Sequence, residues 1–262
     1  MRDFRILALH MEHILEHRSR SLVWFLSSVF NPLLMLLFWR GALQGNSHGV
    51  TLSSITSYYF LLVIAGSLLT SHIEEGVAEI DIQEGKLSQY IIRPYSYYAL
   101  KTCEELPFRI LQGAYGLLTC FIFVFFFGNF LVLEHDPIHI LLSIIVALLA
   151  FFMSFTYKMI LGFVAFWTTD TGGFFQLMEI VTIILGGYLM PFELMPAYIT
   201  KISFIMPFSY MIYFPVTAFQ GKYSASTLGN IIGIQIIWLL LLFVLYRFMW
   251  KGGMKKFTAI GQ

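Results

Sequence analysis

The sequence predicts an all-α polytopic membrane protein, because it is very apolar, sparsely charged and contains six long hydrophobic stretches. Of its 262 residues, 58% are hydrophobic and 12% are charged, about half the charge of an ordinary soluble domain. Each stretch is close to the roughly 20 residues that a spanning helix needs. The six predicted spans are 22–43, 55–71, 107–127, 138–167, 174–190 and 228–248. No repeat of fixed period and no separate soluble domain is visible, so residues 1–262 are expected to form a single membrane domain.

The first twenty residues predict an amphipathic helix that lies in the membrane interface. They are too polar to be the hydrophobic region of a signal peptide. Apolar residues recur at helical spacing from Phe4 to Leu15, with charged residues on the opposite side, a pattern typical of interfacial helices. A surface helix packed on its own protein would show the same pattern.

Lysine and arginine residues predict the side of the membrane on which each connection lies. Four arginines precede the first span, and Lys86, Arg93 and Lys101 lie between the second and the third. Four more basic residues follow position 246, whereas connections 44–54 and 129–137 contain none. By the positive-inside rule, both termini and the loop 72–106 are cytoplasmic. Lys158, inside the long fourth span, suggests a break in that helix or a cytoplasmic extension of it.

The loop 72–106 carries much charge for so apolar a chain, with seven of the fifteen acidic residues between positions 74 and 105. Two glycines and Pro94 limit it to one or two short helices, which we expect along the cytoplasmic membrane face. Apolar residues in it recur at helical spacing. These are Ile73, Val77, Ile80 and Leu87, with Glu75, Glu79 and Asp81 off the stripe. Either the ends of the protein's own spans or a docked cytoplasmic protein covers the stripe.

The apolar segment 191–223 predicts a re-entrant helical hairpin between the fifth and sixth spans. Pro191, Pro196, Pro207 and Pro215 divide it into pieces too short to cross a bilayer, because proline blocks a continuous helix. Non-helical backbone is tolerated at membrane depth only where it is buried in protein or lines a cavity. Two short helices that enter and return over a central pathway fit this composition. An ordinary extracytoplasmic loop with apolar packing is the alternative.

Two sets of residues resemble the patterns of the membrane subunits of ABC type-2 exporters. The first is Glu84-Gly85-Lys86-Leu87 followed by Arg93-Pro94, after the second predicted span. The second set comprises Phe166-Trp167, Gly187, Pro191, Pro196, Pro207-Phe208, Tyr213, Pro215 and Gly221. The resemblance covers nearly the whole chain. It is strongest to the small six-span permeases that are often paired with a second permease and a separate ATPase.

The resemblance implies a role for the charged loop and for the segment after the fifth span. In that family, the loop after the second span holds a coupling helix that docks on a cytoplasmic ATPase. The residues that would contact the ATPase or act as hinges are Glu79, Asp81, Glu84, Gly85, Leu87 and Arg93. Those that would line or gate the translocation path are Glu179, Tyr188, Pro191, Phe192, Pro207 and Tyr213.

The same resemblance implies the partners and the location of the chain. It would be the permease subunit of an exporter in the cell membrane, as in the bacterial inner membrane, and would form a homodimer or a heterodimer with a second permease. The chain has no G-x-x-x-x-G-K-[ST] phosphate loop, so ATP and Mg²⁺ are expected on the partner ATPase and no cofactor on this chain. Membrane lipid is expected as a further partner, and nucleic acid is not.

Two other functions compete with transport driven by ATP. Glu104, Glu105 and Arg109 fit the E-E-x-x-x-R pattern of membrane-embedded glutamate proteases, but no later span has a histidine in its apolar core. A structural role at the junction of loop and span, with Arg109 on a glutamate or a lipid phosphate, also explains them. Glu179, inside the fifth span, would suit a transporter driven by an ion gradient, or else a hydrogen bond between helices.

No metal site is expected. Two groups of residues have a spacing that could hold a metal ion: the histidines at 10, 13 and 17, and the acidic and histidine residues at 134–139. Histidines at a membrane interface that bind no metal are nevertheless commoner. Cys103 and Cys120 suit neither a metal site nor a disulfide framework.

Overall fold

The computed structural model describes residues 51–127 and 136–257, together with the single positions 26, 30, 33, 34, 37, 38, 41 and 133. Within these ranges the chain is helical and contains no strand, which confirms the all-α fold class. The predicted interfacial helix 1–20 lies outside the described residues, and the predicted span 22–43 does so almost entirely. The helices are α3 (Leu52–Leu69), η1 (Gly76–Gln83), α4 (Leu87–Ile91), α5 (Tyr97–Phe127), α6 (Pro137–Gly162), η3 (Phe163–Phe166), α7 (Gly172–Gly186), η4 (Phe192–Leu194), α8 (Ala197–Ile205), α9 (Pro207–Met211), α10 (Tyr213–Phe219) and α11 (Ala225–Met254).

Three of the described helices are long and apolar enough to cross a membrane: α3, α6 together with η3, and α11. α7 has 15 residues, which is about 22 Å of helix against a hydrocarbon core of about 30 Å. Its helix ends at Gly186, four residues before the predicted end, because Gly187 adopts a left-handed conformation (φ 84°) that closes the helix. The count of six spans stays a prediction.

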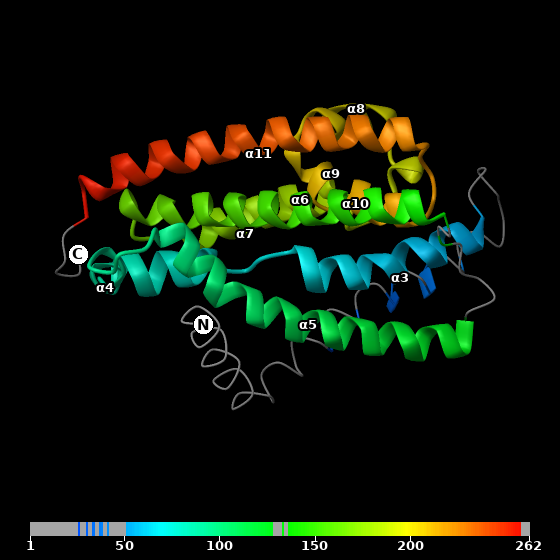
Figure 1. Cartoon of the computed structure of the whole chain (residues 1–262), viewed down its shortest axis with the longest axis horizontal. Coiled ribbons are helices and arrows are strands. Elements are labelled where there is room, and N and C mark those ends of the chain that lie inside the picture. The colour runs from blue at the N-terminus through cyan, green and yellow to red at the C-terminus, as the bar shows by residue number, and fades with distance from the viewer. Residues whose placement is uncertain are drawn as a thin grey trace.

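The long helices run side by side along the longest axis of the molecule (Figure 1). α6 and α11 form the most extensive pair, and α3 lies against both α5 and α6. α3 is the most buried of the three apolar helices and α11 the least. The side chain of Gln235 in α11 donates to the carbonyl of Val146 in α6 (3.0 Å) and to that of Tyr210 in α9 (2.9 Å). Such buried polar bonds hold helices together where lipid offers no alternative partner.

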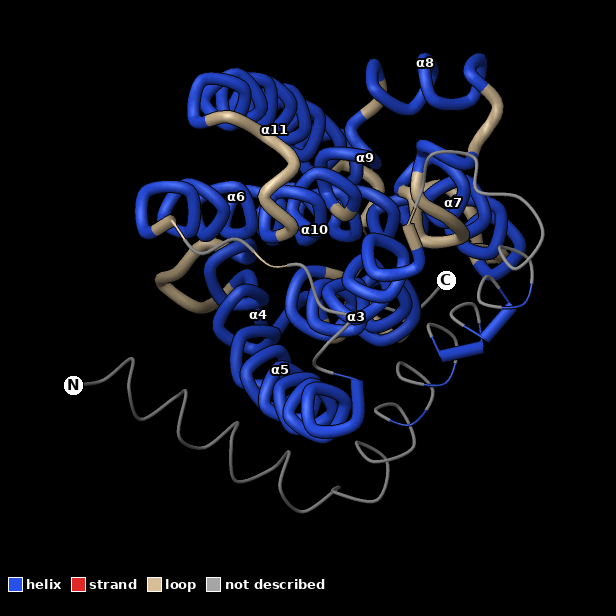
Figure 2. Tube along the Cα trace, turned by 90° about the vertical axis from the view of Figure 1, so that its right-hand side faces the viewer, coloured by secondary structure: helices blue, strands red, loops and turns tan. Residues whose placement is uncertain are grey.

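The segment 191–219 forms short helical pieces, as its prolines predict, but the breaks differ from the expected ones. α8 ends before Pro207, whereas Pro215 lies inside the first turn of α10. A proline is tolerated there because the first backbone donors of a helix have no partner within it. α9 and α10 pack against α6, and α10 also against α3, so they lie at the centre of the helix bundle in an end-on view (Figure 2). Their depth in a membrane stays a prediction.

Two helices differ from the expected boundaries. α5 starts at Tyr97 and continues through Pro107, which was the predicted first residue of the third span. α6 continues through Lys158 without a break, so of the two alternatives for this residue the break was wrong and the cytoplasmic extension stays a prediction. Lys158 is only 5% exposed, and an ion pair with Glu74 allows its charge to remain inside the protein.

Candidate functional site

The loop between α3 and α5 folds as a compact segment at the end of the bundle where the C-terminal end of α11 also lies (Figure 1). It consists of the π-helix η1, a turn and the short helix α4. Gly85 makes the turn with φ 78°, a conformation that glycine adopts without a steric penalty. We call residues 71–96 the cytoplasmic segment, after the side of the membrane that its basic residues predict. The prediction of one or two short helices is therefore confirmed.

One face of the cytoplasmic segment packs on the protein's own helices. Val77 and Leu87, two members of the predicted apolar stripe, are 1% and 0% exposed. Val77 lies against Gly162 at the end of α6, so closely that a β-carbon there would be 2.6 Å from its Cγ1. The stripe is therefore covered by the chain itself at these two positions.

The π-helix changes which residues face inward, and here the prediction was wrong. Ile80 was expected on the buried stripe and is 43% exposed, whereas Asp81 was expected beside it and is 1% exposed. A π-helix bonds residue i to i+5 rather than i+4. Each turn therefore contains more residues than an α-helical pattern assumes, so Ile80 turns away from the face of Val77, while Asp81, four residues after Val77, stays on it.

Asp81 links η1 to the start of α5. Its carboxylate oxygen Oδ2 is 2.7 Å from Nζ of Lys101 and accepts a 2.6 Å hydrogen bond from the hydroxyl of Tyr97. Lys101 also contacts Glu104 (2.9 Å) and Tyr90 (3.1 Å). Burial alone would lower the pKa of Lys101, but the carboxylates of Glu104 and Asp81 outweigh it and raise that pKa. Lys101 is therefore an ammonium ion at neutral pH and holds the buried carboxylate of Asp81.

Two further polar links join the start of the cytoplasmic segment to α5 and α6. The hydroxyl of Ser71 donates to Glu105 Oε1 (2.9 Å), which also accepts from Nε of Arg109 (2.6 Å). Glu74 forms the buried ion pair with Lys158 of α6. The predicted structural role of Arg109 on a glutamate is thus confirmed.

Sequence reasoning missed three partners: Tyr97, Lys101 and Lys158. An available signal was the lysine at 158, because an ionisable residue in an apolar helix requires a partner.

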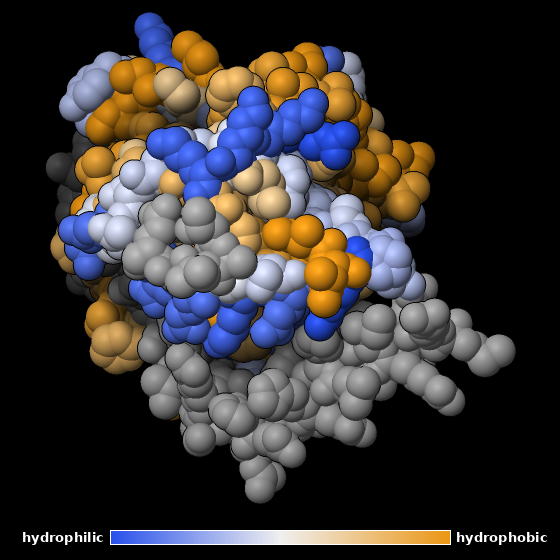
Figure 3. All heavy atoms as spheres, turned by 90° about the vertical axis from the view of Figure 1, so that its left-hand side faces the viewer, coloured by the Kyte–Doolittle hydropathy of each residue, from blue (hydrophilic) through white to orange (hydrophobic). Residues whose placement is uncertain are grey.

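The opposite face of the cytoplasmic segment is exposed and charged. Glu75, Glu79, Glu84 and Arg93 are exposed in the described part of the chain. Glu84 pairs with Lys86 in a solvent-exposed ion pair (3.0 Å), which contributes little stability. Hydrophilic side chains surround apolar patches on this end of the molecule (Figure 3). Among the exposed apolar residues of the segment, Ile92 is 84% exposed.

The structure therefore divides the six predicted coupling residues into two groups. Glu79, Glu84 and Arg93 are on the surface, the last with its guanidinium 5.5 Å from the centre of the Tyr90 ring. Asp81 and Leu87 are buried and Gly85 makes the turn. A partner protein could touch only the first group directly, whereas the second group fixes the shape of the segment.

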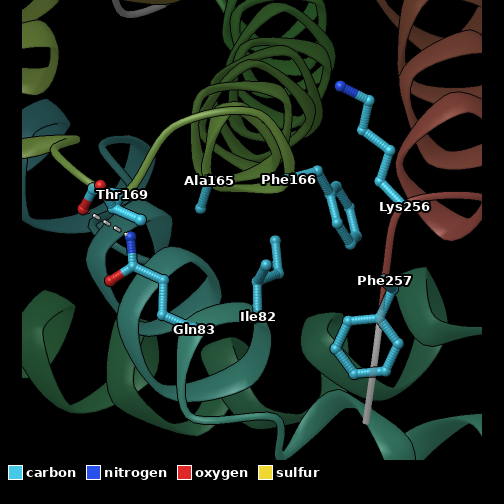
Figure 4. A pocket seen from close by; sticks show the side chains of 7 residues that line it. All are labelled: Ile82, Gln83, Ala165, Phe166, Thr169, Lys256 and Phe257. Carbon is cyan, nitrogen blue, oxygen red and sulfur yellow. Dashed lines mark hydrogen bonds between the residues drawn. The ribbon is translucent and has the colours of Figure 1, made fainter. Parts of the chain in front are cut away.

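A small cavity of about 140 Å³ separates η1 from the C-terminal end of the described chain (Figure 4). At one side of it, Nε2 of Gln83 donates to the carbonyl of Thr169 (2.9 Å), which joins η1 to the connection that leads into α7. The residues that line it are Ile82, Gln83, Ala165, Phe166, Thr169, Lys256 and Phe257. The cytoplasmic segment thus also contacts the α6–α7 connection.

The predicted gate residues do not all lie together. Phe192 and Tyr213 contact each other with ring centroids 4.5 Å apart, and the hydroxyl of Tyr213 donates to Glu193 (3.1 Å). The hydroxyl of Tyr188 is instead 2.8 Å from that of Thr70, at the C-terminal end of α3.

The other gate residues are placed differently. Pro191 and Pro207 are buried at the starts of η4 and α9. Glu179 is exposed on α7 together with Gln176, close enough to Glu74 and Tyr188 to interact with them electrostatically. The structure therefore gathers Phe192 and Tyr213 but leaves Glu179 on a separate face.

The remaining candidates form simple structural contacts. Glu104 pairs with Lys101 and Tyr90, so neither glutamate of the protease-like pattern is free of protein partners. His139 pairs with Asp136. Among the described residues, no group of three or more acidic, histidine or cysteine side chains could hold a metal ion.

Comparison with known protein families places the chain. A family profile described as ABC-2 family transporter protein matches residues 27–261. The chain belongs to this family. This ABC-2 protein is therefore a membrane permease component of an ABC transporter, which works with an ABC ATPase and is not itself the ATPase. No curated protein and no solved structure matches the ABC-2 chain significantly.

Proposed function

We propose that the chain is the permease subunit of an ATP-driven exporter and is coupled to a separate cytoplasmic ATPase through residues 72–106. The observation that carries the proposal is the two-sided construction of the cytoplasmic segment. One side presents Glu79 and Glu84 to solvent, and the other is joined by buried ion pairs to α5 and α6.

The buried links explain how docking of the ATPase would move the membrane helices. Asp81 holds η1 to α5 through Lys101, and Glu74 holds its start to α6 through Lys158. Breaking a buried ion pair by removing one partner costs about 3–5 kcal/mol. A displacement of the segment is therefore passed to both helices rather than absorbed by a flexible loop. ATP and Mg²⁺ bind to the partner in this mechanism.

We further propose that two permeases, identical or related, enclose the path. Gln176 and Glu179 project from α7 and are exposed within the described residues. Polar side chains in a membrane-spanning region usually face a helix bundle or a water-filled cavity, and a second permease would supply that environment. The gate at the outer end is built around Phe192 and Tyr213, whose rings contact each other. We place both termini in the cytoplasm, in line with the distribution of basic residues. Export and the bacterial inner membrane rest on the resemblance alone.

Charge reversal on the exposed face tests the coupling. The double variant Glu79→Arg/Glu84→Arg is expected to reduce co-purification of the ATPase at least about tenfold, because like charges placed across an interface cost several kcal/mol. The amount of permease in the membrane should not change, since both side chains are exposed. Asp136→Arg provides the control: a charge reversal of the same kind, at one exposed position on the predicted outer face. Undiminished recovery of ATPase with the double variant would contradict the proposal.

A further inference from the structure

A pocket of about 390 Å³ lies between the C-terminal end of α11 and the connection from α4 to α5, and its volume is within the range of pockets that bind small molecules. α4 and the C-terminal end of α11 lie at the same end of the bundle (Figure 1), which is the predicted cytoplasmic side. Tyr95 and Ser96 line the pocket from the connection, and Tyr246, Arg247 and Trp250 line it from α11. We call it the α11 pocket.

Aromatic rings form one wall of the α11 pocket. Trp250 stacks on Tyr97 with ring centroids 5.0 Å apart, and Tyr246 meets the ring of Tyr98 edge-on at 5.3 Å. The hydroxyls of Tyr97 and Tyr98 are bonded to other parts of the protein, so the protein's own contacts fix this wall. Tryptophan and tyrosine are enriched at the level of the lipid head groups, and the wall is therefore expected at that level.

The α11 pocket offers positive charge and no negative charge. Arg247 is the one charged residue among the described residues that line it, and it forms no ion pair with an acidic residue of the described chain. Tyr246 is 4% exposed, and no group in the described ranges forms a hydrogen bond with its hydroxyl. Arg247 is close enough to this hydroxyl to interact with it electrostatically. Since buried polar groups are nearly always paired, the two neighbours indicate an anionic acceptor from outside the protein.

An exposed apolar strip leads from the α11 pocket toward the middle of α11. Phe243, which lines the pocket, follows Leu240 and Ile236 at helical spacing, and all three are exposed. They lie within the predicted sixth span, so the strip is at the depth of the hydrocarbon core. A free anion would leave the strip uncovered, whereas an acyl chain attached to the anion would cover it.

We infer that the α11 pocket binds an anionic phospholipid of the cytoplasmic leaflet, with its phosphate on the guanidinium of Arg247 and the hydroxyl of Tyr246 and one acyl chain along the strip. A guanidinium matches the geometry of a phosphate better than other side chains. Basic pockets between membrane helices on the cytoplasmic side are typical sites for anionic head groups. The head group would fill the space between the cytoplasmic segment and the last span.

Native mass spectrometry of the purified full complex tests the inference. The complex is stripped of lipid and then given equal amounts of a phosphatidylglycerol and a phosphatidylcholine with the same acyl chains. Phosphatidylglycerol is expected to be retained several-fold better, and Arg247→Gln should reduce its retention about tenfold, the loss of roughly one charge-assisted contact. Lys251→Gln is the matched control, because it removes an exposed positive charge from the next turn of α11 without lining the pocket, and it should leave retention unchanged.

A second variant tests the buried hydroxyl. Tyr246→Phe removes an oxygen that has no hydrogen bond within the described chain, so the fold should be preserved while retention of phosphatidylglycerol falls about fivefold, the loss of one hydrogen bond. Tyr198→Phe removes an exposed hydroxyl of α8, outside the pocket, and should have no effect.

Three results would overturn the inference: equal retention of the two lipids by the wild type, unchanged retention in either pocket variant, or equal losses in Arg247→Gln and Lys251→Gln. Displacement of the lipid by inorganic phosphate alone would show a free-phosphate site instead. The readout needs no ATP, so it is independent of the coupling proposal.

Discussion

Replacing Lys101 with methionine tests whether the ion pair with Asp81 holds the cytoplasmic segment on α5. The change leaves the carboxylate of Asp81, which is 1% exposed, with the hydroxyl of Tyr97 as its remaining strong donor. Removing one partner of a buried pair costs about 3–5 kcal/mol, and the lower limit already corresponds to more than a hundredfold in an equilibrium constant. Local opening of residues 76–91 should increase by that factor.

Hydrogen exchange of the amides of residues 76–91 in the purified complex measures this opening. Lys86→Met is the matched control, because its pair with Glu84 is exposed and contributes at most about 1 kcal/mol. The double variant Asp81→Asn/Lys101→Met removes both charges and should recover a large part of the loss, a coupling of about 2 kcal/mol in a double-mutant cycle. Strictly additive effects, or exchange in Lys101→Met at the wild-type rate, would refute the reasoning.

Two more substitutions test packing, each by the melting temperature of the purified complex. Gly162→Ala would place its β-carbon 2.6 Å from Val77 and should destabilise the protein by about 1–3 kcal/mol through overpacking. Gly173→Ala is the control, because open space surrounds this glycine. Equal melting temperatures of the two variants would contradict the contact. Tyr58→Phe removes the 2.7 Å hydrogen bond to the carbonyl of Gly187 and should cost about 1–3 kcal/mol by leaving a buried acceptor unpaired, so an unchanged melting temperature would show that another donor replaces it.

The parts of the fold that depend on local pattern could be predicted from the sequence. Length and hydropathy located α6 and α11, since a long apolar run has few other stable forms in a membrane. α11 nevertheless extends beyond the predicted span at both ends, from Ala225 to Met254. The prolines likewise predicted that residues 191–219 would form short pieces. The breaks were less predictable, because the effect of a proline depends on its position: Pro215 and Pro107 both lie within helices.

The candidate site depended on contacts that no local pattern contains. Glu74 and Lys158 are 84 positions apart, and only the packing of η1 on the end of α6 brings them together. The helical stripe correctly marked Val77 and Leu87 as buried. It failed at Ile80 and Asp81, because an α-helical stripe contains neither the π-helical bonding of this stretch nor the ion pair of Asp81 with Lys101.

The π-helix has a consequence for changes in chain length. Residues 76–83 form a π-helix in which Asp81 reaches Lys101 while Ile80 turns outward. Deleting a single residue from this stretch would allow ordinary α-helical bonding but bring a neighbouring side chain into the buried position. An insertion or deletion in η1 would thus break the ion pair between Asp81 and Lys101 and place a different side chain opposite the lysine. The exposed turn around Lys86 makes no buried contact that depends on its length. Length variants should therefore be tolerated in the turn and excluded from the helix before it.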